Sequence, residues 1–289
     1  MAGIKTNSDS NQPESGSENA LSFRIETTIA DEESPFHSLG KNCICDTDSR
    51  GFSTPRKRSR QEIVVDASEG FIPLWDINSL LRWRFQERSV AVFKDPEAAK
   101  NEIRKLFGEA LLQWDDATPI KFKEDNDLWD FEIVVRSADQ CSIAGCVLAS
   151  AFFPDTGRHE FVIYPKMFTQ TRKEQIDTFI HEIGHIFGLR HFFAKISETD
   201  WPSEIYGTHD KFSIMNYGAL SELTENDKKD LKSLYDAVWF NAISTINGTP
   251  VKLVKPYSAL ASIPTGAEVL ADLSKPFQQP YKIYLVPTA

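Results

Sequence analysis

Three stretches of the chain carry apolar residues at three- and four-residue spacing, the pattern of a helix with one buried face. The first spans residues 95–114, the second about 171–189, and the third begins at Thr224. Thr224 is followed three residues later by Asp227, which resembles a capping box with Asp in place of the usual Glu. The residues predicted to face the core are Ala99, Ile103, Leu106, Ala110, Trp114, Ile176, Phe179, Ile180, Ile183, Phe187, Leu231, Leu234, Tyr235 and Val238.

Short runs rich in β-branched and aromatic residues alternate with these helices and predict strands. Pro154 stops one of these runs, and proline is tolerated at the edge of a sheet rather than in its centre, so this run is predicted to be an edge strand. The sequence therefore predicts a mixed domain of helices and sheet. The predicted strands are residues 82–85, 90–93, 120–122, 131–135, 147–153 and 160–164, with strand-like pieces at 251–254 and 281–286.

The two ends of the chain lack this regular pattern. Residues 1–60 are dense in Ser, Asn, Asp, Glu and Lys and are predicted to be disordered or propeptide-like, with a short extended piece at 21–29. The basic run at 56–60 is open to three interpretations: a solvated linker, a processing site, or a nuclear-import-like patch. Ordered sequence is predicted to begin near residues 61–65, and 242–289 is an extension to which the sequence assigns no role.

Composition narrows the class of protein. The formal net charge of -10 and the pI near 5.2 argue against a nucleic-acid partner held by phosphate contacts. No apolar run is long enough for a transmembrane helix. The first twenty residues lack the apolar core of a cleavable signal peptide, so we expect a cytoplasmic protein or one delivered by an unconventional route.

The four cysteines fall in two close pairs, Cys43/Cys45 and Cys141/Cys146. Cys141 and Cys146 either stay reduced or close a small disulfide loop, and the sequence leaves both open. Neither pair has the CxxC spacing of a zinc ribbon, which argues against a structural cysteine-zinc site.

The run HEIGHIFGLRH at 181–191 carries the strongest chemical pattern. His181 and His185 lie four residues apart on a predicted helix, so their imidazoles share one face and can bind one metal ion. Gly188 can turn the chain sharply after the helix and bring His191 back to the same ion. Three histidines leave one coordination position for water, as in catalytic zinc sites. Glu182 follows the first ligand directly and can act as general base toward a zinc-activated water.

This run, followed by Ser-Ile-Met-Asn-Tyr at 213–217, resembles the extended motif and methionine turn of the metzincin clan of zinc endopeptidases. The resemblance covers roughly residues 81–239 and is closest to the matrixin and serralysin side. It implies an α+β catalytic domain over 61–241, with a twisted mixed sheet, an active-site helix and a C-terminal helix. It also implies that Met215 forms a hydrophobic floor under the metal, and that Tyr217 is catalytic through a zinc or transition-state contact.

We therefore interpret the chain as a monomeric zinc-dependent endopeptidase with one catalytic Zn²⁺. The alternative is a catalytically weak, zinc-bound protein-interaction module, but such a module has no need of Glu182. The resemblance further implies a protein or peptide substrate that binds as an extended strand along residues 147–153. The matrixin cysteine-switch sequence is missing, and Cys43 or Cys45 as a latency ligand is an open hypothesis.

Overall fold

The computed structural model describes residues 43–44, 63–67, 70–142, 145–191, 203–206, 213–215 and 221–261. The extended piece predicted at 21–29 and the strand-like piece at 281–286 lie outside these residues. The first longer strand, β2 (Ile63–Asp66), begins where ordered sequence was predicted to begin, and it pairs with β11 (Ser203–Tyr206) in antiparallel fashion.

A five-stranded mixed sheet forms the centre of the fold, as predicted. Its strand order is β5-β4-β6-β10-β9, in which the neighbours pair in parallel except for β9, which is antiparallel to β10. β9 therefore lies at one edge. In this order the strands are β5 (Lys121–Glu124), β4 (Leu80–Phe85), β6 (Phe131–Val135), β10 (His159–Ile163) and β9 (Ala149–Ser150).

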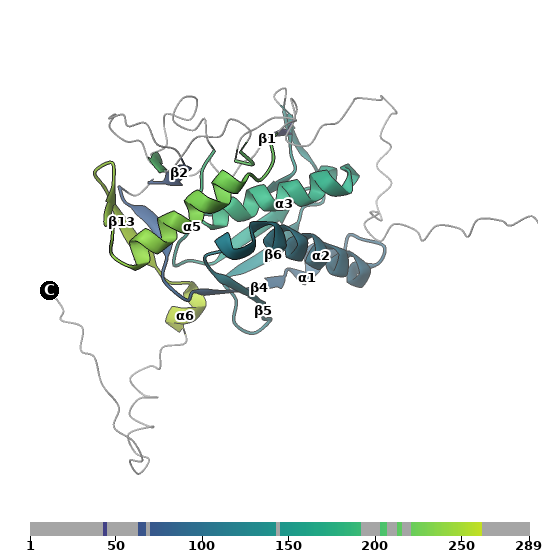
Figure 1. Ribbon diagram of the computed structural model, residues 1–289. Coiled ribbons are helices and arrows are strands. Elements are labelled where there is room, and N and C mark those ends of the chain that lie inside the picture. The colour runs from purple at the N-terminus through teal and green to yellow at the C-terminus, as the bar shows by residue number, and fades with distance from the viewer. Residues whose placement is uncertain are drawn as a thin grey trace, which may run out of the picture.

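The three predicted helices are confirmed as α2 (Pro96–Trp114), α3 (Arg172–Ile186) and α5 (Glu225–Trp239). α2 and α3 pack against each other in front of the central strands, and α5 lies in the same layer (Figure 1). Shorter helical turns are α1 (Glu87–Val90), η2 (Asp115–Ala117) and η3 (Pro165–Thr169). Among the helices of the described chain, none combines the length and apolar character that a membrane crossing requires.

Each long helix begins at a side chain that accepts a backbone N–H of the first turn, which would otherwise lack a partner. Asp95 does so for α2, with proline at the next position. Thr171 and Glu174 form a reciprocal capping box at the start of α3. Thr224 and Asp227 form the predicted box at the start of α5.

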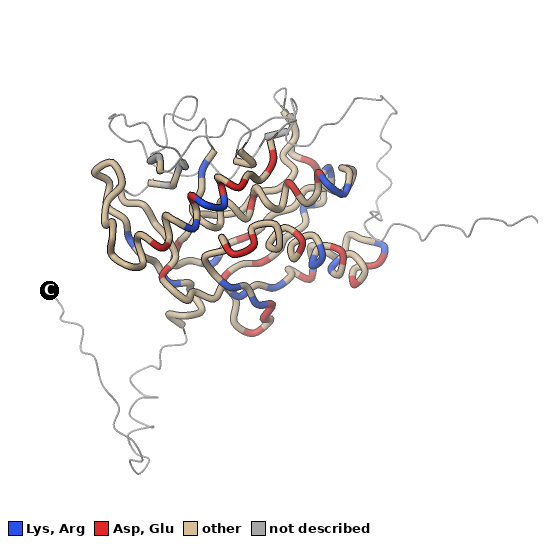
Figure 2. The backbone as a smooth tube through the Cα atoms, in the orientation of Figure 1, with Lys and Arg blue, Asp and Glu red and all other residues tan. Residues whose placement is uncertain are grey.

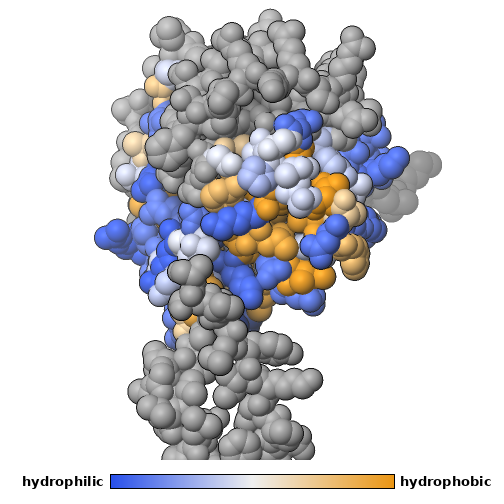
Figure 3. Space-filling model, turned by 90° about the vertical axis from the view of Figure 1, so that its left-hand side faces the viewer, coloured by the Kyte–Doolittle hydropathy of each residue, from blue (hydrophilic) through white to orange (hydrophobic). Residues whose placement is uncertain are grey.

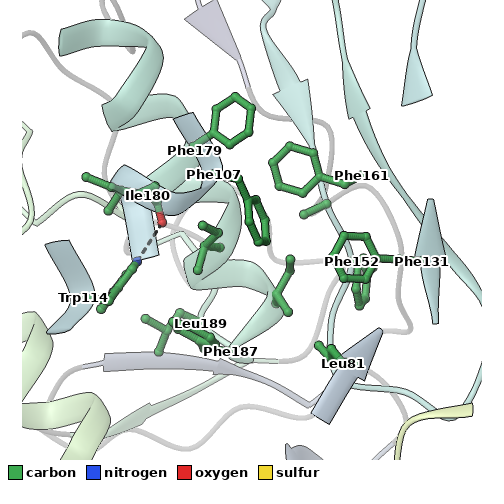
Figure 4. Packing of buried hydrophobic residues seen from close by; sticks show 14 of the residues in the cluster. Leu81, Phe107, Trp114, Phe131, Phe152, Phe161, Phe179, Ile180, Phe187 and Leu189 are labelled. Carbon is green, nitrogen blue, oxygen red and sulfur yellow. Dashed lines mark hydrogen bonds between the residues drawn. The ribbon is translucent and has the colours of Figure 1, made fainter. Parts of the chain in front are cut away.

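Aromatic side chains fill the space between the helices and the sheet (Figure 4). Phe179 of α3 lies 5.2 Å from Phe161 of β10 and 6.4 Å from Phe107 of α2, measured between ring centroids. Phe107 also lies 6.3 Å from Phe131 of β6. Offset and edge-on pairs at such distances stabilise a core beyond the apolar area that they bury. This core fixes the position of α3 relative to the sheet.

Acidic and basic residues are interspersed along the surface of α2 and α5 (Figure 2). Arg172, at the start of α3, contacts Glu102 and Glu109 of α2, and Arg104 of α2 donates two hydrogen bonds to Glu124 of β5. These partly exposed ion pairs link helix to helix and helix to sheet. Their contribution to stability is small next to that of the aromatic core.

The predicted strand at 90–93 is wrong. α1 ends at Val90 and a turn follows. Val90 and Phe93 are fully buried while Ala91 is exposed, which is the spacing of a helical turn rather than the alternation of a strand. Four apolar residues in a row are too few to separate the two structures from sequence.

The predicted edge strand at 147–153 divides into two. β9 is the edge of the central sheet, whereas β8 (Gly145–Val147) belongs to a separate sheet between β7 (Gln140–Ser142) and β1 (Cys43–Ile44). β8 runs antiparallel to β7 and parallel to β1. A disulfide between Cys141 and Cys146 joins β7 to β8, which is one of the two alternatives that the sequence left open.

Residues 245–261 pack on the same domain. β13 (Thr249–Val254), which includes the strand-like piece predicted at 251–254, pairs in parallel with β3 (Ile72–Trp75) and antiparallel with β12 (Thr245–Ile246). In α6 (Tyr257–Ala261), Ser258 donates its N–H and O–H to the buried carboxylate of Asp130, at 2.6 and 2.9 Å. The division of the chain at 60 and 241 stays a prediction, but this part of the extension contacts the core.

An apolar area lies on the side of the molecule that carries β13 (Figure 3). Exposed large apolar side chains on or next to β3, α5 and β13 are Ile77, Phe240 and Leu253. Single exposed apolar side chains are common on protein surfaces and need no special role.

Candidate metal centre

The second half of α3 brings two of the predicted ligands together, and the turn after it adds the third. The Nε2 atom of His181 lies 3.2 Å from that of His185 and 3.0 Å from that of His191. All three side chains are fully buried. Among the described residues, these three histidines form the one cluster of His, Cys, Asp and Glu side chains whose ligand atoms could hold a metal ion.

The outer nitrogen of two of these rings is bound to a backbone carbonyl. His181 Nδ1 lies 2.7 Å from the oxygen of Ile214, and His185 Nδ1 lies 2.7 Å from the oxygen of Leu189. A carbonyl oxygen only accepts, so in each neutral ring Nδ1 carries the proton and donates it. The Nε2 lone pairs of both rings therefore face the centre of the cluster.

Such a cluster fits a metal ion. Two unprotonated nitrogens at 3.2 Å repel each other unless a cation lies between them. Two nitrogen ligands of one tetrahedral zinc ion lie roughly 3.3 Å apart, given a zinc–nitrogen bond of about 2.0–2.1 Å. Neutral imidazoles with a bonded outer N–H are also the ligand type that such ions prefer.

The turn after α3 has the conformation predicted for Gly188. Its φ is +92°, in the left-handed region that residues with a side chain rarely adopt. A Cβ atom added there would lie 3.2 Å from the side chain of Leu74 and 3.4 Å from the carbonyl oxygen of Pro73. The N–H of Leu189 then bonds back to Gly184 at 3.0 Å, so the helix ends tightly and the chain reverses toward the cluster.

Met215 packs against α3 between the first two histidines. A Cβ atom added at Gly184 would lie 2.5 Å from the sulfur of Met215, so no side chain fits at this position without displacing the methionine. Met215 is buried, and its N–H donates to the hydroxyl of Ser213 at 3.1 Å. Residues 213–215 thus form a turn that lies directly on the helix that carries the cluster.

Asp227, the capping residue of α5, also contacts this turn. Burial raises the pKa of its carboxyl, and the bonds from Ser213, Thr224 and the N–H of Ile214 oppose that rise. Ile214 holds His181 through its carbonyl oxygen. The start of α5 is therefore connected to the first histidine through a single residue.

Other predicted site residues lie as follows. Glu182 is buried and directly follows His181 in α3. Tyr217 lies outside the described residues. The sequence did not single out Phe153, whose ring centroid is 5.5 Å from that of His185, or the carbonyl groups of Leu189 and Ile214. No residue type signals a backbone carbonyl, so only the fold could reveal these two partners.

Residues 81–236, more than half of the chain, match the family model of the matrixins. The chain belongs to the matrixin family, within the metzincin clan of metalloproteases. Its α+β fold is that of a metzincin catalytic domain.

Similar proteins include stromelysin-3 of Homo sapiens, which is 30% identical over 125 residues, 39% of this chain and 26% of that protein. Macrophage metalloelastase of Rattus norvegicus is 24% identical over 184 residues, 60% of this chain and 37% of that protein. The chain thus spans about a quarter to a little over a third of the length of these relatives. A solved structure of myroilysin matches 60% of this chain and 98% of its own, with 15% identity and a TM-score of 0.39.

Replacing Gly184 by alanine tests the contact between Met215 and α3. Alanine favours a helix by about 1 kcal/mol over glycine, but crowding a packed core costs about 1–3 kcal/mol. We expect Gly184→Ala to lower the free energy of unfolding by about 1 kcal/mol in urea denaturation. Gly108→Ala in α2 is the matched control, because no atom other than the neighbouring backbone of α2 itself lies within 4 Å of the added Cβ. It should gain about 0.5–1 kcal/mol. Equal stabilisation by both changes would show that Met215 does not press on this position.

Proposed function

We propose that the protein is a zinc-dependent endopeptidase with His181, His185 and His191 as the ligands of one Zn²⁺. The observation that carries the proposal is the convergence of three buried Nε2 atoms, two of which belong to rings whose Nδ1–H is held by a carbonyl. Membership of the matrixin family supports the same reading. Three protein ligands leave a position for water or substrate, as catalytic zinc sites require.

When bound, zinc supplies a Lewis acid that makes water nucleophilic at neutral pH and polarises the substrate carbonyl. Glu182 is the general base of the reaction. Its place next to His181 on α3, in a buried part of the helix, supports this role. Its carboxylate takes a proton from the attacking water and returns it to the nitrogen of the leaving amine. Burial excludes bulk water from this exchange, which strengthens the electrostatic interactions of the carboxylate.

Two residues of the run 213–217 contribute to the proposed site and reaction. Met215 forms the apolar floor below the ligands, and its packing on Gly184 supports this role. Tyr217 donates a hydrogen bond to the oxygen that becomes negative as the carbonyl is attacked.

We further propose that the substrate is a protein or peptide that binds as an extended strand along β9. β9 is an edge strand, and the chain continues from it to Phe153, whose ring contacts that of His185. A peptide that adds to this edge would therefore pass beside the proposed ligands, with backbone hydrogen bonds that hold it regardless of sequence. We expect the enzyme to act as a monomer.

The overall proposal is tested with a peptide library derived from a proteome, incubated with and without a chelator, followed by sequencing of the new termini. We expect internal peptide bonds to be cleaved only in the absence of chelator. Stoichiometric zinc without any cleavage would instead support the alternative, a catalytically weak protein-interaction module.

Replacing the proposed base, Glu182, should slow the reaction without changing zinc binding. We expect Glu182→Gln to bind one zinc per chain and to lose at least about 100-fold in kcat, the scale of a missing acid–base group. Glu160→Gln is the control, because the carboxylate of Glu160 lies in an exposed ion pair with Arg136, and it should keep full activity. Near-normal cleavage by Glu182→Gln would remove Glu182 from the mechanism.

The tyrosine proposal has its own test. A hydrogen bond to a charged group contributes about 1.5–3 kcal/mol, so Tyr217→Phe should lower kcat roughly tenfold or more with zinc content unchanged. Tyr206→Phe serves as the control, because the hydroxyl of Tyr206 pairs with Ser233 on the surface. If kcat is the same for Tyr217→Phe and wild type, Tyr217 only packs.

A further inference from the structure

We propose that Trp75 and Tyr235 are positioning residues that fix the third ligand, His191, by holding the C-terminal turn of α3. This inference rests on the proposed metal site, but it concerns two residues remote in sequence from the HEIGHIFGLRH run. Both are fully buried side chains of other elements, Trp75 in β3 and Tyr235 in α5.

The last carbonyl groups of a helix have no partners within it, and at the end of α3 two of them, those of Ile186 and Phe187, accept hydrogen bonds from these two side chains. The indole Nε1–H of Trp75 donates to the carbonyl of Ile186 at 2.7 Å. The hydroxyl of Tyr235 donates to the carbonyl of the next residue, Phe187, at 3.0 Å. Both bonds are buried, so no water replaces them if they are lost.

These two bonds lie between the second and the third ligand. The carbonyl of Leu189, also in this turn, accepts the Nδ1–H of His185. Side chains thus hold the carbonyl groups on both sides of Gly188, whose conformation sets the direction in which the chain leaves the helix. A glycine with a positive φ has wide conformational freedom, so its geometry must be fixed by its neighbours. His191, three residues after Gly188, is placed by that direction.

Trp75 and Tyr235 also hold each other. The backbone N–H of Trp75 lies 3.4 Å from the Tyr235 hydroxyl, and the indole of Trp239, one turn along α5, donates to the Trp75 carbonyl at 2.9 Å. Burial raises the pKa of Tyr235, so its hydroxyl keeps the proton that it donates to Phe187. Trp75 of β3 and Tyr235 of α5 therefore contact each other, and both bond to the C-terminal turn of α3.

In this arrangement residues 249–254 contribute indirectly to the proposed metal site, through their contacts with β3. β13 pairs with β3 in parallel, with Val254 opposite Trp75. The N–H of Asp76 donates to the carbonyl of Val254 at 2.9 Å. The segment that sequence reasoning left without a role thereby supports the strand that carries Trp75.

A third indole, that of Trp114 in α2, also bonds to a carbonyl of α3, but not at the C-terminal end of this helix. The Nε1–H of Trp114 donates to the carbonyl of Ile180 at 3.2 Å (Figure 4). Ile180 lies inside α3, where a carbonyl also accepts the N–H four residues later. Loss of the Trp114 bond leaves no helix end unsupported. The Trp114 ring packs on that of Phe187, at 5.6 Å between centroids, but the carbonyl groups of Ile186 and Phe187 keep their donors.

The test measures zinc affinity of the full chain by competition with a chromophoric chelator, for Trp75→Phe, Tyr235→Phe and Trp114→Phe. Unfolding of the metal-free proteins is measured in parallel. We expect Trp75→Phe and Tyr235→Phe to lower zinc affinity about tenfold or more, the scale found for outer-shell partners of metal ligands. Trp114→Phe removes the same atoms as Trp75→Phe from the same core. It should lower stability but leave zinc affinity within about twofold of wild type.

Unchanged affinity in Trp75→Phe and Tyr235→Phe would overturn the inference, as would an equal loss in Trp114→Phe. Tyr235→Phe removes one oxygen atom only, so it gives the answer even if Trp75→Phe fails to fold. If wild type itself binds no stoichiometric zinc, the proposed function fails and this inference fails with it. If wild type binds zinc normally and the variants equal it, only the positioning role is lost.

Discussion

Everything at the proposed site depends on holding three imidazole nitrogens about 3 Å apart inside a protein core. Without a cation the unprotonated nitrogens of His181 and His185 repel each other, so the fold must supply the restraint. A straight helix can present two of them, because residues four apart share a face. It cannot present the third, and the turn at Gly188 provides the change of direction that brings His191 in.

Several elements of the fold hold α3 in place, and each contacts this helix at a different point. The aromatic core fixes the helix on the sheet through Phe179. The turn at 213–215 holds His181 through the carbonyl of Ile214 and packs Met215 on Gly184. Trp75 and Tyr235 hold the carbonyl groups at the end of the helix. A buried site held from several sides loses little conformational freedom when a metal binds, which favours binding.

Much of this could be predicted from the sequence, because regular elements leave a periodic pattern. The stripes of apolar residues gave the three long helices, and the spacing within 181–191 gave the histidine cluster and the turn at Gly188. The pattern failed where it was short: four apolar residues at 90–93 suited a strand or a helical turn equally well. It also failed where the partner is a backbone group, as with the carbonyl groups of Ile214 and Leu189. The bonds of Trp75 and Tyr235 join residues more than 40 positions from their partners, a distance that no local pattern reports.

The central claim is that three histidines bind one zinc ion through Nε2. Crystals of zinc-loaded protein, with anomalous diffraction recorded on both sides of the zinc absorption edge, test it most directly. The account predicts one anomalous peak per chain, bonded to Nε2 of His181, His185 and His191 at about 2.0–2.1 Å. A peak bonded to other side chains, or no stoichiometric zinc in the loaded protein, would contradict it.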